Sequence, residues 1–213
     1  MTQQRLVLLG RWPAPSRCKR RLAVSVGLWR AAAVQQRLLW HGLWAASQAS
    51  REAQQKGQPM EVVFALTGLG PRATRRWGCS LPADRVVNQG EGSLGVRLQR
   101  QVRHAARDGM DRLVIVGTDL PQLCSADLLA AFQALHHSAL VVGPASDGGY
   151  WLIGLSPQRL APRLFAGAQR PIPWGTNQVL ASTLEAAAAE GLKPFFLPER
   201  SDLDRIEDLL RWR

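Results

Sequence analysis

Short apolar runs that stop at a glycine alternate along this chain with segments of helical periodicity. The runs cover residues 6–9, 61–66, 113–116 and 139–142, and a glycine follows each within two residues. Strands buried on both faces of a parallel sheet read as continuous apolar runs, because helices cover the two faces. The alternation therefore predicts an α/β fold, a three-layer α/β/α sandwich with a mainly parallel sheet.

Apolar residues at helical spacing predict the helices that connect these strands. The predicted helices cover residues 29–50, 94–107, 127–135, 176–190 and 205–212, and residues 195–197 form a further short strand. Ser125 is the expected N-cap of the third helix, and Thr176 opens the fourth as a cap or a ligand contact. Residues 70–92, with scattered glycine and proline, allow no clear prediction. Because no linker or repeat divides the 213 residues, we expect a single domain over residues 1–213.

Basic residues are concentrated near the N-terminal end. The net charge is +11, residues 1–51 contain nine of the 27 basic side chains and no acidic one, and the first acidic residue is Glu52. Such a segment favours contact with phosphate on a small nucleotide or on a polymer, or with an anionic membrane surface. Composition alone does not choose among these partners.

Cysteine usage and hydropathy indicate the compartment. Cys18, Cys79 and Cys124 are odd in number and far apart, which argues against a disulfide framework or a structural zinc site. No apolar stretch reaches the roughly 18 residues that a membrane span needs. We therefore expect a cytoplasmic protein without a transmembrane segment.

The first strand leads into a basic loop, RWPAPSRCKRRL at residues 11–22, which two prolines keep out of helix. Arg11, Lys19 and Arg21 are its candidate phosphate contacts, because arginine and lysine neutralise a diphosphate through charge-assisted hydrogen bonds. A solvated basic loop is the alternative. The sequence contains no GxxxxGK[ST] motif, so a P-loop is not expected.

Carboxylates follow a later strand and precede the last helix. Asp119 comes directly after the run at 113–116, where it could hold Mg²⁺ or Mn²⁺ against phosphates, although an aspartate there also forms turns and caps. Asp202 and Asp204, two residues apart before the last helix, could add a second metal ligand, and Asp204 is the preferred candidate. Acidic residues at a helix N-terminus also stabilise the helix without any function.

The run at 139–142 leads into SDGGYWLIGL. Gly148 and Gly149 permit close backbone approach to a ligand, Asp147 offers a carboxylate, and Tyr150 and Trp151 offer flat faces for a sugar. A plain β-turn is the alternative.

Six segments, taken in order, resemble a family of bacterial A-type (GT-A) glycosyltransferases. The segments are RWPAPSRCKRRL, NQGEGSLGVRL, GTDLP, GPASDGGYWLIGL, PWGT and SDLDRIEDL. Some members of that family are linked to arsenosugar biosynthesis, and the family is related to nucleotidyltransferases that make the molybdenum and deazaflavin cofactors. The resemblance implies a Rossmann-like nucleotide-diphospho-sugar transferase fold over nearly the whole chain.

The resemblance also implies roles for individual residues. Asp119 and Asp204 become metal ligands for Mg²⁺ or Mn²⁺, and Arg11, Lys19 and Arg21 become phosphate contacts. Asp147 is the catalytic candidate that orients the sugar or activates the acceptor. The sugar and acceptor candidates are Gly148, Gly149, Tyr150 and Thr176.

This sequence departs from the family pattern at two places. Arg20 stands where the family has the threonine of Lys-Thr-Arg-Leu, and Gly92-Ser93 interrupts a Gly-Asp-Leu-Gly stretch. The first change could alter nucleotide choice or weaken phosphate binding.

The leading hypothesis is a metal-dependent glycosyltransferase that moves a sugar from a UDP- or GDP-linked donor to a small-molecule acceptor. The runner-up is a nucleotidyltransferase of the cofactor guanylyltransferase type. A third hypothesis is a non-catalytic relative that binds nucleotide, nucleic acid or anionic lipid through residues 5–51. Nucleic acid is the less favoured partner, and homo-oligomerisation stays open.

Overall fold

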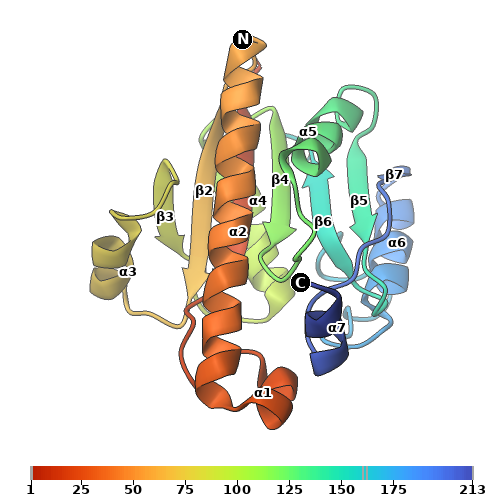
Figure 1. Cartoon of the computed structure of the whole chain (residues 1–213). Coiled ribbons are helices and arrows are strands. Elements are labelled where there is room, and N and C mark those ends of the chain that lie inside the picture. Colours follow the sequence, from red (N-terminus) through yellow and green to blue (C-terminus); the bar gives the residue numbers. More distant parts are fainter. Residues whose placement is uncertain (1, 160, 162, 213) are drawn as a thin grey trace.

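The structure is a computed structural model that describes residues 2–159, 161 and 163–212 (Figure 1). In chain order its elements are β1 (Gln4–Arg11), α1 (Arg20–Val26), α2 (Leu28–Gln55), β2 (Met60–Thr67), α3 (Pro71–Gly78), β3 (Arg85–Asn88), α4 (Leu94–Arg107), β4 (Arg112–Gly117), α5 (Ser125–Ala134), β5 (Leu140–Pro144), β6 (Tyr150–Leu155), α6 (Val179–Ala189), β7 (Pro194–Phe196) and α7 (Ile206–Arg211).

The strands form one seven-stranded sheet in the order β3-β2-β1-β4-β6-β5-β7. Strand β1 pairs in parallel with both β2 and β4, so that Leu6 lies between Val62 and Val114. Strand β6 alone among these strands is antiparallel to its neighbours, β4 and β5. The prediction of an α/β fold with a mainly parallel sheet is confirmed.

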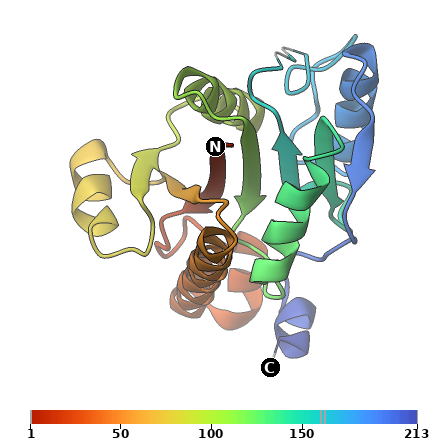
Figure 2. The same ribbon diagram turned by 90° about the horizontal axis from the view of Figure 1, so that it is seen from above.

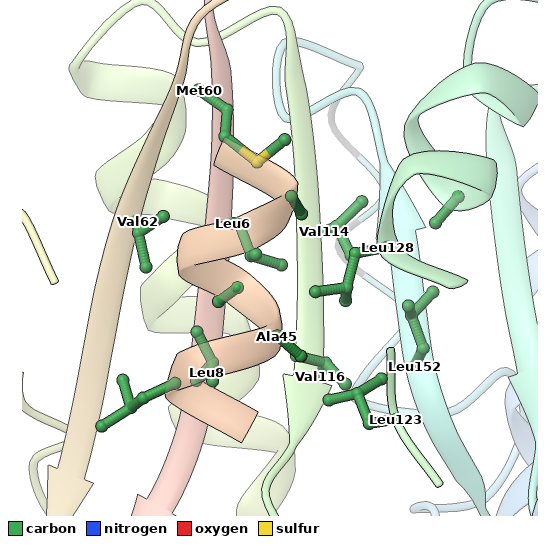
Figure 3. Close-up of a cluster of buried hydrophobic side chains, with 14 of the residues drawn as sticks. Leu6, Leu8, Ala45, Met60, Val62, Val114, Val116, Leu123, Leu128 and Leu152 are labelled. Atoms are coloured by element: carbon green, nitrogen blue, oxygen red, sulfur yellow. The ribbon is translucent and has the colours of Figure 1, made fainter. Parts of the chain in front are cut away.

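Helices cover both faces of the sheet, as the view in Figure 2 shows. On one face α2 and α5 contribute to a buried cluster that includes Leu6 and Leu8, and on the other face α4 and α6 contribute to a second cluster that includes Val7. Successive strand residues point to opposite faces, and both faces of β1 are buried because both carry helices. Figure 3 shows part of the cluster that contains Leu6 and Leu8, in which Ala45 of α2 is buried together with Leu8 of β1 and Val116 of β4.

The structure differs from the sequence prediction at several element boundaries. Helix α5 begins at Ser125 itself, and the preceding Cys124 is its N-cap, with the Cys124 amide donating to Asp127 Oδ2 at 3.2 Å. The helix predicted from residue 176 begins at Val179. Residues 70–92, which allowed no clear prediction, contain α3 and β3. Strand β3 has a weak pattern because it is short and lies at the edge of the sheet, and α3 has a weak pattern because Thr74 is its one buried residue.

The carboxyl ends of the parallel strands lie where α1 and α7 flank the sheet (Figure 1). There the buried side chain of Gln89 joins two strands, because its Nε2 donates to the carbonyl oxygens of Gly10 and Ala65 at 2.9 and 2.8 Å. Among the described residues, no helix combines the length and apolar character needed to cross a membrane.

Replacing Gln89 with glutamate should destabilise the fold. A carboxylate cannot donate to the two carbonyl oxygens, and a buried polar group that loses its partner costs about 1–3 kcal/mol. We expect urea denaturation to show a free energy of unfolding lower by about that amount or more. The matched control is Gln36→Glu, an exposed position on α2 with the same change of charge, which should have little effect. Equal stability of the two variants would contradict the joining role of Gln89.

Candidate functional site

Two adjoining hollows open at the carboxyl edge of the sheet. The first, of about 340 Å³, lies at the ends of β1, β2 and β4, and the second, of about 520 Å³, lies at the end of β5 and beside α6. Leu94 and Asp204 line both hollows and so mark their border. Loops and helix ends converge at this edge in an open α/β sheet, which makes it the expected ligand position.

The first hollow is lined by basic side chains. They are Arg11, Arg17, Lys19, Arg20 and Arg97. Arg11 extends from the end of β1, and its Nη1 donates to the carbonyl oxygen of Arg17 at 3.0 Å. Arg20 is exposed at the start of α1, so the residue that departs from the family pattern adds a cation to this hollow. The electrostatics of the hollow suit a polyanion such as a diphosphate.

Lys19 is the buried member of this group, and its side chain is only 2% exposed. Its Nζ lies 2.8 Å from Asp119 Oδ1 and 3.8 Å from Asp204 Oδ1, and it donates to the Leu203 carbonyl oxygen at 2.6 Å. The backbone of Lys19 is left-handed, with φ 45°, a conformation that costs free energy for a residue with a side chain. Lys19 therefore joins the loop after β1 to the carboxylates rather than reaching freely into the hollow.

Four carboxylates lie near the border of the two hollows: Asp119, Asp147, Asp202 and Asp204. The pKa of Asp202 is shifted by the other three. Burial, together with the negative charges of Asp119, Asp147 and Asp204, raises the pKa of Asp202 to about 7, while Lys19 opposes the rise. An ionised carboxyl at this place is unfavourable because it is partly removed from water and surrounded by like charge. Lys19 and Arg21 pair with Asp119 and Asp204, so the border brings acidic and basic side chains together beside the basic hollow.

The donor set of Asp119 and Asp204 fits a hard divalent cation. Both carboxylates are about half exposed, at 45% and 47%, and Mg²⁺ and Mn²⁺ prefer oxygen ligands that include one or two carboxylates, phosphate oxygens and water. Within the described residues, no group of three or more His, Cys, Asp or Glu side chains is arranged to hold a metal ion. These residues could therefore supply part of a coordination shell that a bound phosphate would complete.

The second hollow contains the polar turn between β5 and β6. Asp147 is exposed there, and its Oδ1 accepts a hydrogen bond from the Gly149 amide at 2.9 Å. Gly148 has φ 84°, and a Cβ at this position would lie 2.1 Å from the Asn177 carbonyl oxygen. Glycine is thus required at 148 to bring this turn against the segment before α6, and the two together form one wall of the hollow.

Aromatic side chains line the other wall of the second hollow. The ring centroids of Tyr150 and Trp174 are 6.5 Å apart in a T-shaped arrangement, and burial raises the pKa of the Tyr150 hydroxyl. Thr176 Oγ1 accepts from the Gln178 amide at 3.2 Å and donates to the Pro173 carbonyl oxygen at 2.8 Å. Trp151 is buried in the core at 3% exposure, so its face is not offered to a ligand.

A third, mainly apolar hollow of about 490 Å³ continues from this wall, because Trp174 lines both spaces. Val96, Phe165 and Ile172 also line the third hollow, together with the guanidinium-bearing Arg103.

The structure thus gathers the predicted site residues at one edge of the sheet. Arg11, Lys19, Asp119 and Asp204 line the first hollow, and Arg21, Asp147, Gly149, Tyr150 and Thr176 line the second, while Gly148 packs behind it. Arg21 is mostly exposed and lies 3.3 Å from Asp204. Their direct contacts with substrate or metal stay predictions.

The cleft also contains polar and aromatic residues outside the predicted set, among them Arg17, Gln35, Gln89, Arg97 and Trp174. Arg97 and Gln89 lie within the NQGEGSLGVRL segment and Trp174 lies within PWGT, so the motifs marked the segments but not these side chains.

Comparison with known families identifies one match. The family described as "Uncharacterized protein conserved in bacteria (DUF2064)" matches residues 51–176, which is more than half of the chain. No curated protein sequence matches this chain.

Solved structures share the fold. A proposed nucleotide-diphospho-sugar transferase from Desulfovibrio desulfuricans G20 is 25% identical, with a TM-score of 0.79 over 98% of this chain and 85% of that chain. The 4-diphosphocytidyl-2C-methyl-D-erythritol synthase of Anaerococcus prevotii DSM 20548 is 8% identical, with a TM-score of 0.62 over 98% and 96%. Glucosyl-3-phosphoglycerate synthase of Mycobacterium tuberculosis, solved with Mn²⁺ and UDP, is 14% identical, with a TM-score of 0.56 over 99% and 75%. The predicted nucleotide-diphospho-sugar transferase fold is confirmed.

The raised pKa of Asp202 leads to a test by pH. The pKa of an aspartate in the unfolded chain is about 4. A carboxyl whose pKa is raised in the folded protein contributes stability that is fully present below that pH and is lost as pH rises through about 7. Asp202→Asn should therefore exceed the wild type in melting temperature by more at pH 8.5 than at pH 5, with about 2–4 °C for each kcal/mol of difference.

Melting is measured with a chelator present, so that metal binding does not contribute. An equal effect of Asp202→Asn at both pH values would contradict the raised pKa.

Proposed function

The chain belongs to the bacterial family DUF2064, and we propose that it is a metal-dependent glycosyltransferase that uses a nucleotide-sugar donor. The observation that carries the proposal is the pairing of a cation-lined hollow with a carboxylate-lined one across a shared border at Asp204. The first would take the diphosphate and the second the sugar, whose hydroxyl groups donate hydrogen bonds to carboxylates. The similar solved structures include a proposed nucleotide-diphospho-sugar transferase and a synthase bound to UDP and Mn²⁺.

In the proposed reaction an acceptor hydroxyl oxygen attacks the anomeric carbon of the sugar. The bond from that carbon to the diphosphate breaks, and the nucleoside diphosphate leaves with the bonding electrons. The acceptor's proton passes to the carboxylate of Asp147. Arg11, Arg17 and Arg20 hold the diphosphate by charge-assisted hydrogen bonds, which strengthen as negative charge develops on the leaving oxygen.

A divalent cation, when bound, would supply further charge neutralisation at the diphosphate. Asp119 and Asp204 would hold it. Lys19 acts as a positioning residue in this scheme, because its ammonium contacts Asp119 directly and lies near Asp204. Its binding to the Leu203 carbonyl oxygen holds the two carboxylates at the border of the hollows.

The acceptor would enter beside Tyr150 and Trp174. The mainly apolar third hollow begins at Trp174, so an acceptor with an apolar group could place that group there while its hydroxyl lies near Asp147.

A nucleotidyltransferase is the second candidate, because one of the similar structures is a 4-diphosphocytidyl-2C-methyl-D-erythritol synthase. In this case a phosphorylated acceptor attacks the α-phosphate of a nucleoside triphosphate and pyrophosphate leaves. The same cations and metal ligands would serve both reactions.

Thermal-shift titration distinguishes these candidates. With Mn²⁺ present, UDP- or GDP-sugars should raise the melting temperature more than nucleoside triphosphates do. A ligand at about 100 times its Kd stabilises by about 2.7 kcal/mol, or roughly 5–10 °C at this chain length. A stronger shift with triphosphates would favour nucleotidyl transfer, and no shift with any nucleotide would overturn both proposals.

Asp119→Asn tests the metal site. The variant keeps an oxygen that can accept from Lys19 but loses the negative charge, so the Mn²⁺-dependent part of the nucleotide shift should disappear while the protein still unfolds cooperatively. Glu185→Gln, exposed on α6, changes charge equally and should retain the full shift. A Mn²⁺-dependent shift of normal size in Asp119→Asn would remove Asp119 from the metal site.

A further inference from the structure

The outer face of α2 carries exposed tryptophans in a line. Trp29, Trp40 and Trp44 are 79%, 39% and 61% exposed. Trp40 and Trp44 follow Trp29 by 11 and 15 residues, which correspond to about three and four helical turns. All three therefore lie on the same side of the helix, which runs along the outside of the sheet in Figure 1. Single exposed apolar residues are ordinary in proteins, but an aligned set of large ones marks an interaction surface.

This line continues around the corner into α1. Val24, five residues before Trp29, and Leu28, next to Trp29 in the chain, are 89% and 50% exposed. Gly27, with φ 84°, turns the chain from α1 into α2 between Val24 and Leu28. Helix α1 also carries Arg20 and Arg21, which line the two hollows of the site. The exposed apolar corner is thus directly beside the mouth of the cleft.

Basic side chains accompany the tryptophans, and acidic ones are lacking on α1 and most of α2. Arg30, Arg37 and Arg51 are exposed on α2, and the Arg37 guanidinium lies 5.4 Å from the Trp212 ring. Glu52, the first acidic residue of the sequence, is directed to α5, where its Oε1 accepts a hydrogen bond from Ser125. Helix α7 adds one exposed acidic residue, Glu207, next to the exposed Arg205.

We propose that this surface, formed by Val24, Leu28, Trp29, Trp40, Trp44 and the arginines at 30, 37 and 51, docks the protein on an anionic lipid bilayer. Tryptophan favours the boundary between headgroups and acyl chains, and arginine pairs with lipid phosphates while its stem packs on apolar groups. A helix with one basic, aromatic side suits a planar lipid surface. Docking would bring the mouth of the cleft to the headgroups.

A second copy of this chain fits the surface less well. A twofold contact places the same patch on both partners, so the arginines of each copy would face those of the other with no acidic residue of α1 or the first six turns of α2 to pair with. Like charges placed across an interface are costly. An anionic lipid surface supplies the missing negative charge.

Vesicle flotation tests the proposal with the full chain. The protein should float with vesicles of phosphatidylcholine containing about 30% phosphatidylglycerol and bind pure phosphatidylcholine at least about tenfold more weakly. Binding should weaken as salt rises from about 0.1 M to about 1 M, because the screening length falls from about 10 Å to about 3 Å.

Two double variants separate the apolar and the charged parts. Trp29→Ser with Trp44→Ser, and Arg30→Glu with Arg51→Glu, should each reduce the vesicle partition coefficient at least about tenfold, since one basic residue near the bilayer contributes about fivefold. The controls are Phe195→Ser with Phe196→Ser on β7 and Arg72→Glu with Arg76→Glu on α3, all exposed. They should bind within about twofold of the wild type. Circular dichroism confirms that each variant is folded.

Absence of flotation with anionic vesicles would overturn the proposal. An equal loss in Arg72→Glu with Arg76→Glu would show binding by net charge alone, and an equal loss in Phe195→Ser with Phe196→Ser would show binding by any exposed apolar side chain. Either result would also overturn the proposal. The proposal would also be wrong if Trp29→Ser with Trp44→Ser abolished a dimer seen by light scattering but left flotation unchanged. It would likewise be wrong if the protein bound single-stranded RNA but not vesicles. The test uses no nucleotide, so its failure is independent of the proposed transferase activity.

Discussion

The buried ammonium of Lys19 holds the candidate site together. It contacts Asp119 after β4 and the Leu203 carbonyl oxygen before α7, and the Leu203 amide in turn donates to the Asp119 carbonyl oxygen at 3.0 Å. Three segments that are distant in sequence therefore meet at one charged group. Because a buried charge without a partner is costly, the loop after β1 can close in this way only when both carboxylate-bearing segments are present. The left-handed backbone at Lys19 is stabilised by these contacts.

The fold divides the basic N-terminal segment among three places. Arg5 is buried at the opposite edge of the sheet, where its guanidinium binds Glu61 and Asp108 at 2.5 and 2.7 Å and holds the pKa of Asp108 below its usual range. Arg11, Arg17, Lys19, Arg20 and Arg21 surround the cleft, and the remaining three arginines lie on the outer face of α2. One compositional feature of the sequence thus corresponds to a structural ion pair, a phosphate-binding candidate and an external surface.

Sequence patterns located most elements that have many apolar residues in regular spacing. Strands β1, β2, β4 and β5 were predicted because they are buried on both faces and read as apolar runs. Strand β3 was not, because it is a short edge strand whose residues are partly or fully exposed, and helix α3 was not, because Thr74 is its one buried residue. The direction of β6 was also beyond the sequence, since an apolar run has the same appearance in either direction. The motif glycines marked the turn at 148, but the requirement for glycine there comes from the approach of Asn177.

The sequence by itself determined the α/β class, the segments that end at the ligand edge and most of the charged residues found there. Those features depend on local periodicity and on residue type, which a single chain displays directly. Only the tertiary structure decided that Lys19 is buried against Asp119, that Asp202 lies among like charges and that the side of α2 with three tryptophans faces away from the sheet. Each of these depends on the distance between segments far apart in the chain, and that distance is set by packing.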